Sequence, residues 1–292
     1  MVVAADDSSS DYCRMKRPTG ACRLCGTFGE LCLSHIIPDL FIRSLEEHIA
    51  TGKSNQTQPA SILLSKQEDI PGGQRQRGYW EKVTGMKEYL LCEGCEGHFA
   101  NHENYFRKFF YGSGNRLKKL PVGDPLPIPI GHISPTFRLL GMRRVLVDFE
   151  KMRLFVLSLL WRASVAKGDF FENCDLGQTH NGRIAEMLLA SNPGTDQEYP
   201  ITIVSLCFEG GGLEDIICPP RVDREGDHRS FSVVIGGFIF MVRIMSQAHG
   251  LPNHDIGLRE TGELIIPLVD ARPLLEEWAR QYKAAGRLPS LL

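Results

Sequence analysis

The sequence lacks an apolar run long enough to cross a membrane. The two longest candidates, Leu154–Trp161 and Val233–Val242, fall short of the roughly 18–20 residues that a membrane helix requires. The opening residues are acidic and serine-rich, so they do not predict a signal peptide. A net charge of -2 gives no global field that would indicate a nucleic acid or a membrane as partner. We therefore expect a cytoplasmic protein with no membrane partner, whose charge must be read locally.

Proline and glycine crowd into one stretch of the chain, residues 112–135. No helix tolerates such a density of these residues, so we place a domain boundary there. The polar segment Thr51–Arg77 has little periodicity and predicts a loop or a mobile insertion. The predicted organisation is a disordered lead-in at 1–18, a cysteine-rich module at 19–112, a linker at 113–135 and a second domain at 136–292.

The second domain mixes helical and strand patterns without a regular βαβ alternation. The expected helices are Glu150–Val165, Gly182–Ala190 and Asp270–Ala285, and the expected strands are Ile201–Phe208, Phe231–Ile244 and Glu263–Leu268. The pair Gly236-Gly237 predicts a bulge or sharp bend in the second strand. This order favours the α+β class, with a mixed C-terminal domain.

Cysteine is more abundant than a chain of this length needs for stability. The 292 residues include nine cysteines, an odd number, which argues against a disulfide framework. Four of them form two CxxC pairs, Cys22/Cys25 and Cys92/Cys95. A two-residue spacer lets both thiolates reach one ion at about 2.3 Å, and two pairs complete a tetrahedron. The sequence therefore predicts a structural Zn²⁺ site.

Two local ligand sets remain open beside the paired one. The first comprises Cys22, Cys25, Cys32 and His35, and the second comprises Cys92, Cys95, His98 and His102. One metal ion per chain would favour the paired arrangement, whereas two ions would favour the local sites.

The element His35-Ile36-Ile37-Pro38 lies between the two CxxC pairs, and Leu91 immediately precedes the second pair. This order of parts resembles the zinc-bearing members of the HNH endonuclease family, which belongs to the His-Me finger, or ββα-metal, nucleases. The resemblance covers about the first third of the chain. It implies a zinc-stapled ββα-metal fold and metal-dependent hydrolysis of nucleic-acid phosphodiesters, often in bacterial restriction or anti-phage defence.

The resemblance assigns His35 as the general base, with Mg²⁺ or Mn²⁺ at the scissile phosphate. The sequence departs from the family pattern at three points. Ser34 replaces the usual Asp or His before the base, residues 85–90 lack the usual Asn, and Glu96 replaces the His that follows the second CxxC. If 96–111 is a helix, the candidate ligands of the catalytic metal are Glu96, His98, His102 and Glu103.

Basic residues cluster just after these candidate ligands, interleaved with aromatic residues. They are Arg107, Lys108, Arg116, Lys118 and Lys119. Cations mixed with aromatic rings predict contact with nucleic acid, DNA ahead of RNA. The C-terminal domain would select a target or a protein partner. The alternative is a catalytically inactive zinc module that binds nucleic acid or a partner protein within a larger complex.

Overall fold

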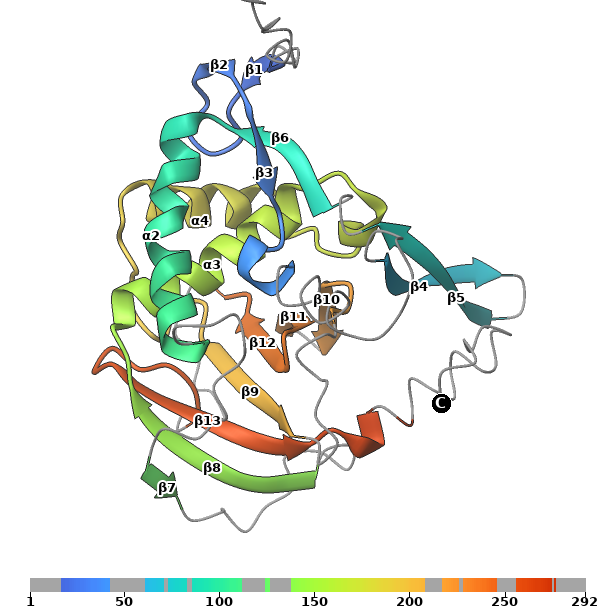
Figure 1. Cartoon of the computed structure of the whole chain (residues 1–292), viewed down its shortest axis with the longest axis vertical. Helices are drawn as coiled ribbons and strands as arrows, with labels where there is room; N and C mark the ends of the chain where they lie inside the picture. Colours follow the sequence, from blue (N-terminus) through green and yellow to red (C-terminus); the bar gives the residue numbers. More distant parts are fainter. Residues whose placement is uncertain are drawn as a thin grey trace, which may run out of the picture.

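The computed structural model describes residues 17–42, 61–70, 73–82, 86–111, 124–126, 138–207, 217–225, 228–245, 256–274 and 276. These residues form helices packed on a mixed sheet, together with three two-stranded sheets (Figure 1). The predicted α+β class is therefore confirmed. None of the described helices is long and apolar enough to span a membrane.

The largest sheet has seven strands in the order β10-β11-β12-β9-β13-β8-β7. Its strands are β7 (Asp124–Leu126), β8 (Arg138–Leu146), β9 (Ile201–Cys207), β10 (Arg221–Glu225), β11 (His228–Ile235), β12 (Phe238–Arg243) and β13 (Glu263–Asp270). All neighbours are antiparallel except β13 and β9. Alternating buried and less buried residues along β9 are typical of a strand with one face on a core.

The single strand predicted over Phe231–Ile244 is divided between β11 and β12. Gly236 and Gly237 form the connecting turn, with φ of 58° and 80°. Positive φ at both central residues suits a two-residue hairpin turn, and glycine adopts it without steric strain. The predicted sharp bend is therefore a full reversal of the chain.

Helical segments cover the sheet and fill the interior, among them α2 (Glu93–Phe110), α3 (Phe149–Val165), the 3₁₀ turn η2 (Asp169–Phe171) and α4 (Gln178–Leu189). Helix α3 is buried around its whole circumference from Met152 to Ala163, as its apolar sequence predicts. The Asp148 side chain caps its start by accepting from Lys151 N at 3.1 Å. Most of the helix expected at Asp270–Ala285 lies outside the described residues.

The hydrophobic core runs across the predicted boundary at 112–135. Phe106 of α2 stacks on Phe155 of α3 with ring centroids 4.2 Å apart, and Phe41 lies 6.2 Å from Phe240 of β12. Strand β7, inside the predicted linker, pairs with β8. The N-terminal third and the seven-stranded sheet therefore share one core cluster.

The polar segment Thr51–Arg77 contains regular structure where a loop was predicted. Strands β4 (Ser61–Ile70) and β5 (Gly73–Lys82) pair in an antiparallel hairpin (Figure 1). The loop prediction is wrong over these residues. Backbone hydrogen bonds hold a hairpin whether or not its side chains alternate, so a weak hydrophobic pattern did not reveal it.

Candidate metal centre and the site around His35

Four short strands precede α2 and place the cysteines: β1 (Thr19–Ala21), β2 (Phe28–Glu30), β3 (Cys32–His35) and β6 (Lys87–Leu91). Strands β1 and β2 pair with each other, and β3 pairs with β6. Cys22 and Cys25 lie in the β1–β2 turn, while Cys92 caps α2 and Cys95 is in its first turn. Arg23 N donates to Leu90 O at 3.0 Å, which links the two halves.

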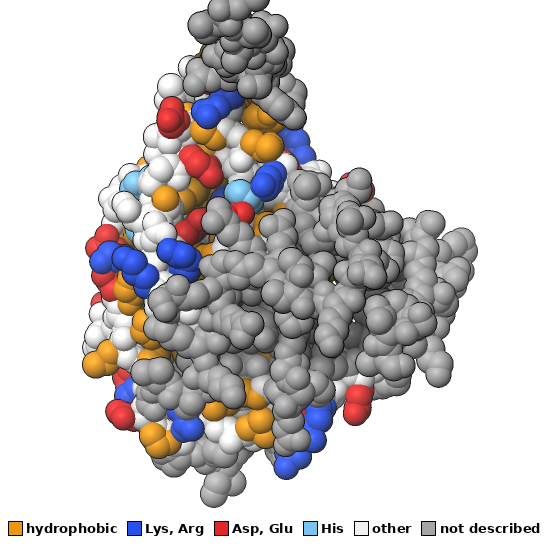
Figure 2. All heavy atoms as spheres, viewed as in Figure 1, with side chains coloured by type: hydrophobic (Ala, Val, Ile, Leu, Met, Phe, Trp, Pro, Cys, Tyr) orange, Lys and Arg blue, Asp and Glu red, His pale blue; other side chains and the backbone are white. Residues whose placement is uncertain are grey.

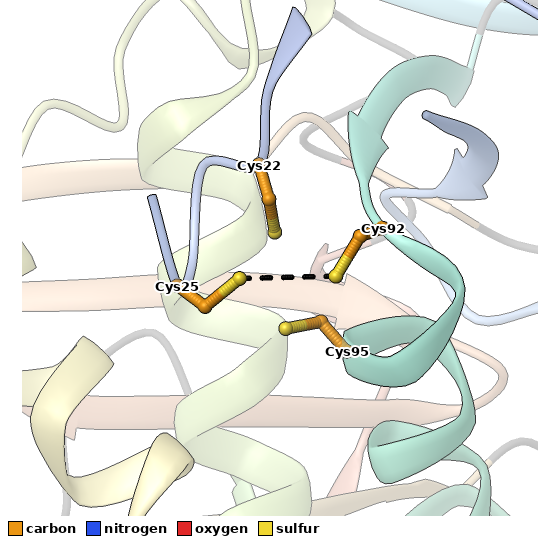
Figure 3. A group of neighbouring side chains, drawn as sticks. All are labelled: Cys22, Cys25, Cys92 and Cys95. Atoms are coloured by element: carbon orange, nitrogen blue, oxygen red, sulfur yellow. Dashed lines mark hydrogen bonds between the residues drawn. The ribbon is translucent and has the colours of Figure 1, made fainter. Parts of the chain in front are cut away.

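The four cysteine side chains point toward one another (Figure 3). Their sulfur atoms all lie within 4.8 Å, and Cys25 Sγ is 3.8 Å from Cys92 Sγ. A disulfide needs about 2.05 Å, so these sulfur atoms are not bonded. Tetrahedral metal–sulfur bonds of about 2.3 Å would set the sulfur atoms about 3.8 Å apart. The arrangement can therefore hold one metal ion.

The protein environment acts differently on individual thiols of this cluster. Hydrogen bonds from Thr27 lower the pKa of Cys25 to about 6, so it is mostly thiolate at neutral pH. Burial raises the pKa of the Cys95 thiol well above its ordinary value. A divalent cation would compensate the cost of holding buried thiolates together, because metal ligation requires the deprotonated form.

The two local ligand sets do not form. Cys32 Sγ lies 3.6 Å from Arg17 Nη1, and His98 Nε2 is 2.8 Å from Leu188 O. Over the described part of the chain, the two CxxC pairs supply the single group of at least three potential ligands at metal-binding separation. The paired arrangement is therefore the one that the fold builds.

His35 is the last residue of β3, opposite Lys87 of β6. Its Nε2 lies 3.1 Å from Oδ1 of Asp39, which begins the helical segment after Pro38. This close contact does not meet the geometry of a hydrogen bond. The His35 carbonyl accepts from Arg162 Nη1 at 2.9 Å. The backbone and ring of His35 are thus each held by a charged side chain.

Burial, with a smaller contribution from Lys87, lowers the pKa of His35. Asp39, Glu103 and Glu96 act on the imidazole in the opposite sense. Because burial prevails, the ring is neutral at pH 7 and can accept a proton. Two carboxylates of α2, Glu96 and Glu103, thus act electrostatically on an imidazole that burial keeps neutral.

The two carboxylates have different partners. Glu96 Oε2 is buried and makes no hydrogen bond to the described residues. Glu103 Oε1 is 2.8 Å from Arg162 Nη1, and this arginine is only 2% exposed. An unpartnered buried carboxylate oxygen is costly unless a cation or water binds it, so Glu96 is the more available ligand.

Helix α2 separates the four candidate ligands predicted from sequence. Glu96 and Glu103 are two helical turns apart and both act on His35. His98 instead contacts the end of α4, where its Nε2 is also 3.3 Å from Ser191 Oγ. His102 is buried beside His98. The structure therefore does not gather all four residues into one site.

The basic cluster predicted after α2 is only partly described. Arg107 and Lys108 are exposed in the last turn of α2. Arg116, Lys118 and Lys119 lie outside the described residues. Figure 2 shows acidic and basic side chains mixed along the edge formed by α2. The described end of α2 therefore offers two basic side chains, and nucleic-acid binding by the full cluster stays a prediction.

Sequence reasoning missed Asp39, Lys87 and Arg162. Asp39 stands four residues after His35, a spacing that could have indicated a contact between the two side chains. The position of Lys87 opposite His35 depends on the register of β3 on β6. The contact of Arg162 with His35 joins residues 127 positions apart in the chain. No local pattern predicts either of these two contacts.

Comparison with known proteins returned no matching family model, no matching curated protein and no matching solved structure.

Proposed function

We propose that this protein is a metal-dependent endonuclease of the HNH type, which hydrolyses nucleic-acid phosphodiesters with His35 as general base. The observation that carries the proposal is the order β3–β6–α2, in which Arg162 Nη1 lies 2.9 Å from His35 O at the end of β3 and 2.8 Å from Glu103 Oε1 of the following helix. Glu96 of the same helix also acts electrostatically on the His35 imidazole. The HIIP element and the two CxxC pairs occupy the corresponding places in the sequence.

We assign a structural Zn²⁺ to the cysteine cluster. Four sulfur ligands within 4.8 Å of one another, with Cys25 Sγ and Cys92 Sγ 3.8 Å apart, suit a closed tetrahedral zinc site. This ion would join the β1–β2 turn to the start of α2. Because His35 follows the first pair and Glu96 follows the second, the zinc would hold the two sides of the reaction site in register.

His35 would take a proton from the attacking water. A small rotation of the ring would let Asp39 accept a hydrogen bond from Nε2–H, which leaves the Nδ1 lone pair for the water. Arg162 fixes the backbone of His35 from behind. Asp39 and Arg162 are thus positioning residues for the base.

Glu96 would hold the catalytic cation through its buried, unpartnered oxygen. A carboxylate oxygen favours Mg²⁺ or Mn²⁺ over softer ions. When bound, such a cation stabilises charge on the phosphate and on the departing oxygen. Glu103 is neutralised by Arg162 and orients this side of the site.

One observation favours the alternative, an inactive zinc module that binds nucleic acid or a partner protein. Ser34 is fully buried, and its hydroxyl donates to Cys32 O at 3.4 Å. It therefore cannot supply the ligand that the HNH family carries before its base. An active enzyme would need Glu96 to replace this missing metal ligand.

The test is cleavage of plasmid and single-stranded DNA and of RNA with Mg²⁺ or Mn²⁺. His35→Ala should lose about 10²–10⁴-fold in rate, the usual contribution of a general base. Glu96→Gln should lose activity, whereas Glu93→Gln, exposed in the same helical turn, should keep it. Zinc content and thermal unfolding check that each variant is folded. Wild-type cleavage by folded His35→Ala would refute the assignment, and no cleavage by any form would support the inactive module.

A further inference from the structure

The outer face of the β3–β6 pair exposes two large apolar side chains side by side. Leu33 of β3 is 48% exposed and Tyr89 of β6 is 47% exposed. The two residues are register partners, so their Cβ atoms lie about 5 Å apart. An aromatic ring that keeps half its surface in water, braced by a leucine, is a surface on which a flat ligand can stack.

This face is also the face of His35. Side chains alternate along a strand, so Leu33 and His35 share one side, as do Lys87 and Tyr89. The intervening pair, Ser34 and Glu88, points the other way: Ser34 is buried, and Glu88 Oε1 accepts from Lys167 N and Gly168 N at 2.7 and 2.9 Å. The outer face thus presents an aromatic ring, a lysine and the candidate base in the two register pairs that flank Ser34 and Glu88.

The irregular pairing of β3 and β6 creates this combination. Cys32 pairs with Leu91 and Leu33 pairs with Tyr89, so Leu90 is the extra residue of a bulge. Leu90 and Leu91 are both buried, and the strand resumes its alternation with Tyr89 outward. Without the bulge, a regular strand that buries Leu91 would bury Tyr89 as well.

We propose that Leu33, Lys87 and Tyr89 form a platform for an unpaired nucleotide, which makes single-stranded nucleic acid the substrate class. Tyr89 stacks on a base, and Lys87, which lies opposite His35 in the β3–β6 register, contacts a phosphate. Tyr89 is two residues, or about 6.8 Å, farther along β6 than Lys87. In a duplex the neighbouring bases cover both faces of each base, so an exposed ring on a strand reaches only an unpaired one. This inference rests on the proposed function, because it takes His35 as the point of cleavage.

The charge of this face favours a nucleotide over a protein partner. The two register pairs on the face are Leu33/Tyr89 and His35/Lys87, a combination that offers stacking and positive charge to a phosphate backbone. Figure 2 shows apolar, basic and histidine side chains next to one another on the part of the surface over β3 and β6. Acidic side chains border the histidine, where the cation of the proposed reaction would neutralise them.

Binding measured in the His35→Ala background tests the platform without cleavage. The probes are fluorescein-labelled oligothymidylate, oligouridylate and a DNA duplex of equal length. Tyr89→Ala should weaken single-strand binding roughly fivefold to a hundredfold, as expected for the loss of one stacked base, and Tyr89→Phe should retain it. Lys87→Gln should reduce the slope of log affinity against log salt by about one phosphate contact. Leu146→Ala, which removes a 77% exposed leucine from β8, is the matched surface control.

The outcomes separate the platform from the nuclease. Unchanged single-strand affinity in Tyr89→Ala, or an equal loss for the duplex, overturns the platform even if His35 proves catalytic. A selective loss with oligothymidylate, oligouridylate or both supports the platform and identifies which polymer it accepts. Selective single-strand binding by a protein that cuts nothing supports the platform and refutes only the proposed hydrolysis.

Discussion

Arg162 is the side chain through which α3 holds the site around His35, and its removal should destabilise the protein. The guanidinium is 2% exposed and lies 5.2 Å over the ring of Phe99. Its Nη1 donates to His35 O at 2.9 Å and lies 2.8 Å from Glu103 Oε1. Arg162→Met keeps the length of the side chain but leaves this carbonyl and this carboxylate without their partner.

The expected loss in free energy of unfolding is about 3 kcal/mol. Removing one partner of a buried ion pair costs about 3–5 kcal/mol, because the other charge stays buried without compensation. The Glu103 side chain is 24% exposed, so water recovers part of this loss and the lower end of the range applies. Adding Glu103→Leu should restore part of the stability, since the orphaned charge is then removed. The double-mutant cycle should show a coupling above about 1 kcal/mol.

Urea unfolding followed by tryptophan fluorescence measures these differences, and Trp161, adjacent to Arg162 in the chain, is a buried reporter. Arg144→Met is the matched control, because Arg144 pairs with Glu263 at 2.5 Å but is 47% exposed. This control should lose less than about 1 kcal/mol. A loss in Arg162→Met no larger than in Arg144→Met, or additive single changes, would refute the reasoning.

Two further predictions concern the metal centre and the β11–β12 turn. Metal analysis should give one zinc per chain. Cys92→Ser should release this zinc and lower the melting temperature, whereas Cys32→Ser should retain it. Two zinc ions per chain would contradict the paired site. Gly236→Ala should destabilise more than Gly26→Ala in the same urea assay, although both glycines have positive φ. A Cβ at Gly236 would lie 2.4 Å from Tyr111 Oη, while one at Gly26 meets nothing within 4 Å. Equal losses of about 1 kcal/mol in free energy of unfolding would show that the clash at Gly236 relaxes freely.

The sequence by itself determined the features that depend on short spacings. Each CxxC pair places two thiols on one side of a turn, and the two pairs could be recognised as halves of one site. The apolar run at Glu150–Val165 determined a buried helix, because no face of it could be left in water. The β-branched stretches determined strands of the sheet, and Gly236-Gly237 determined a sharp change of direction between two of them.

Only the tertiary structure decided which polar residues share the site. Residues 96, 98, 102 and 103 are close in sequence, but the 3.6-residue helical period separates them. Glu96 and Glu103 act on His35, whereas His98 contacts the end of α4 and His102 lies beside His98. The bulge in β6 decided that Tyr89 faces outward beside His35, since one added residue reverses the side of every residue beyond it.

The contact of Arg162 with His35 joins residues 127 positions apart and depends on the packing of α3 against the N-terminal third. Such contacts follow from how buried surfaces fit together, so a pattern read along the chain carries no record of them.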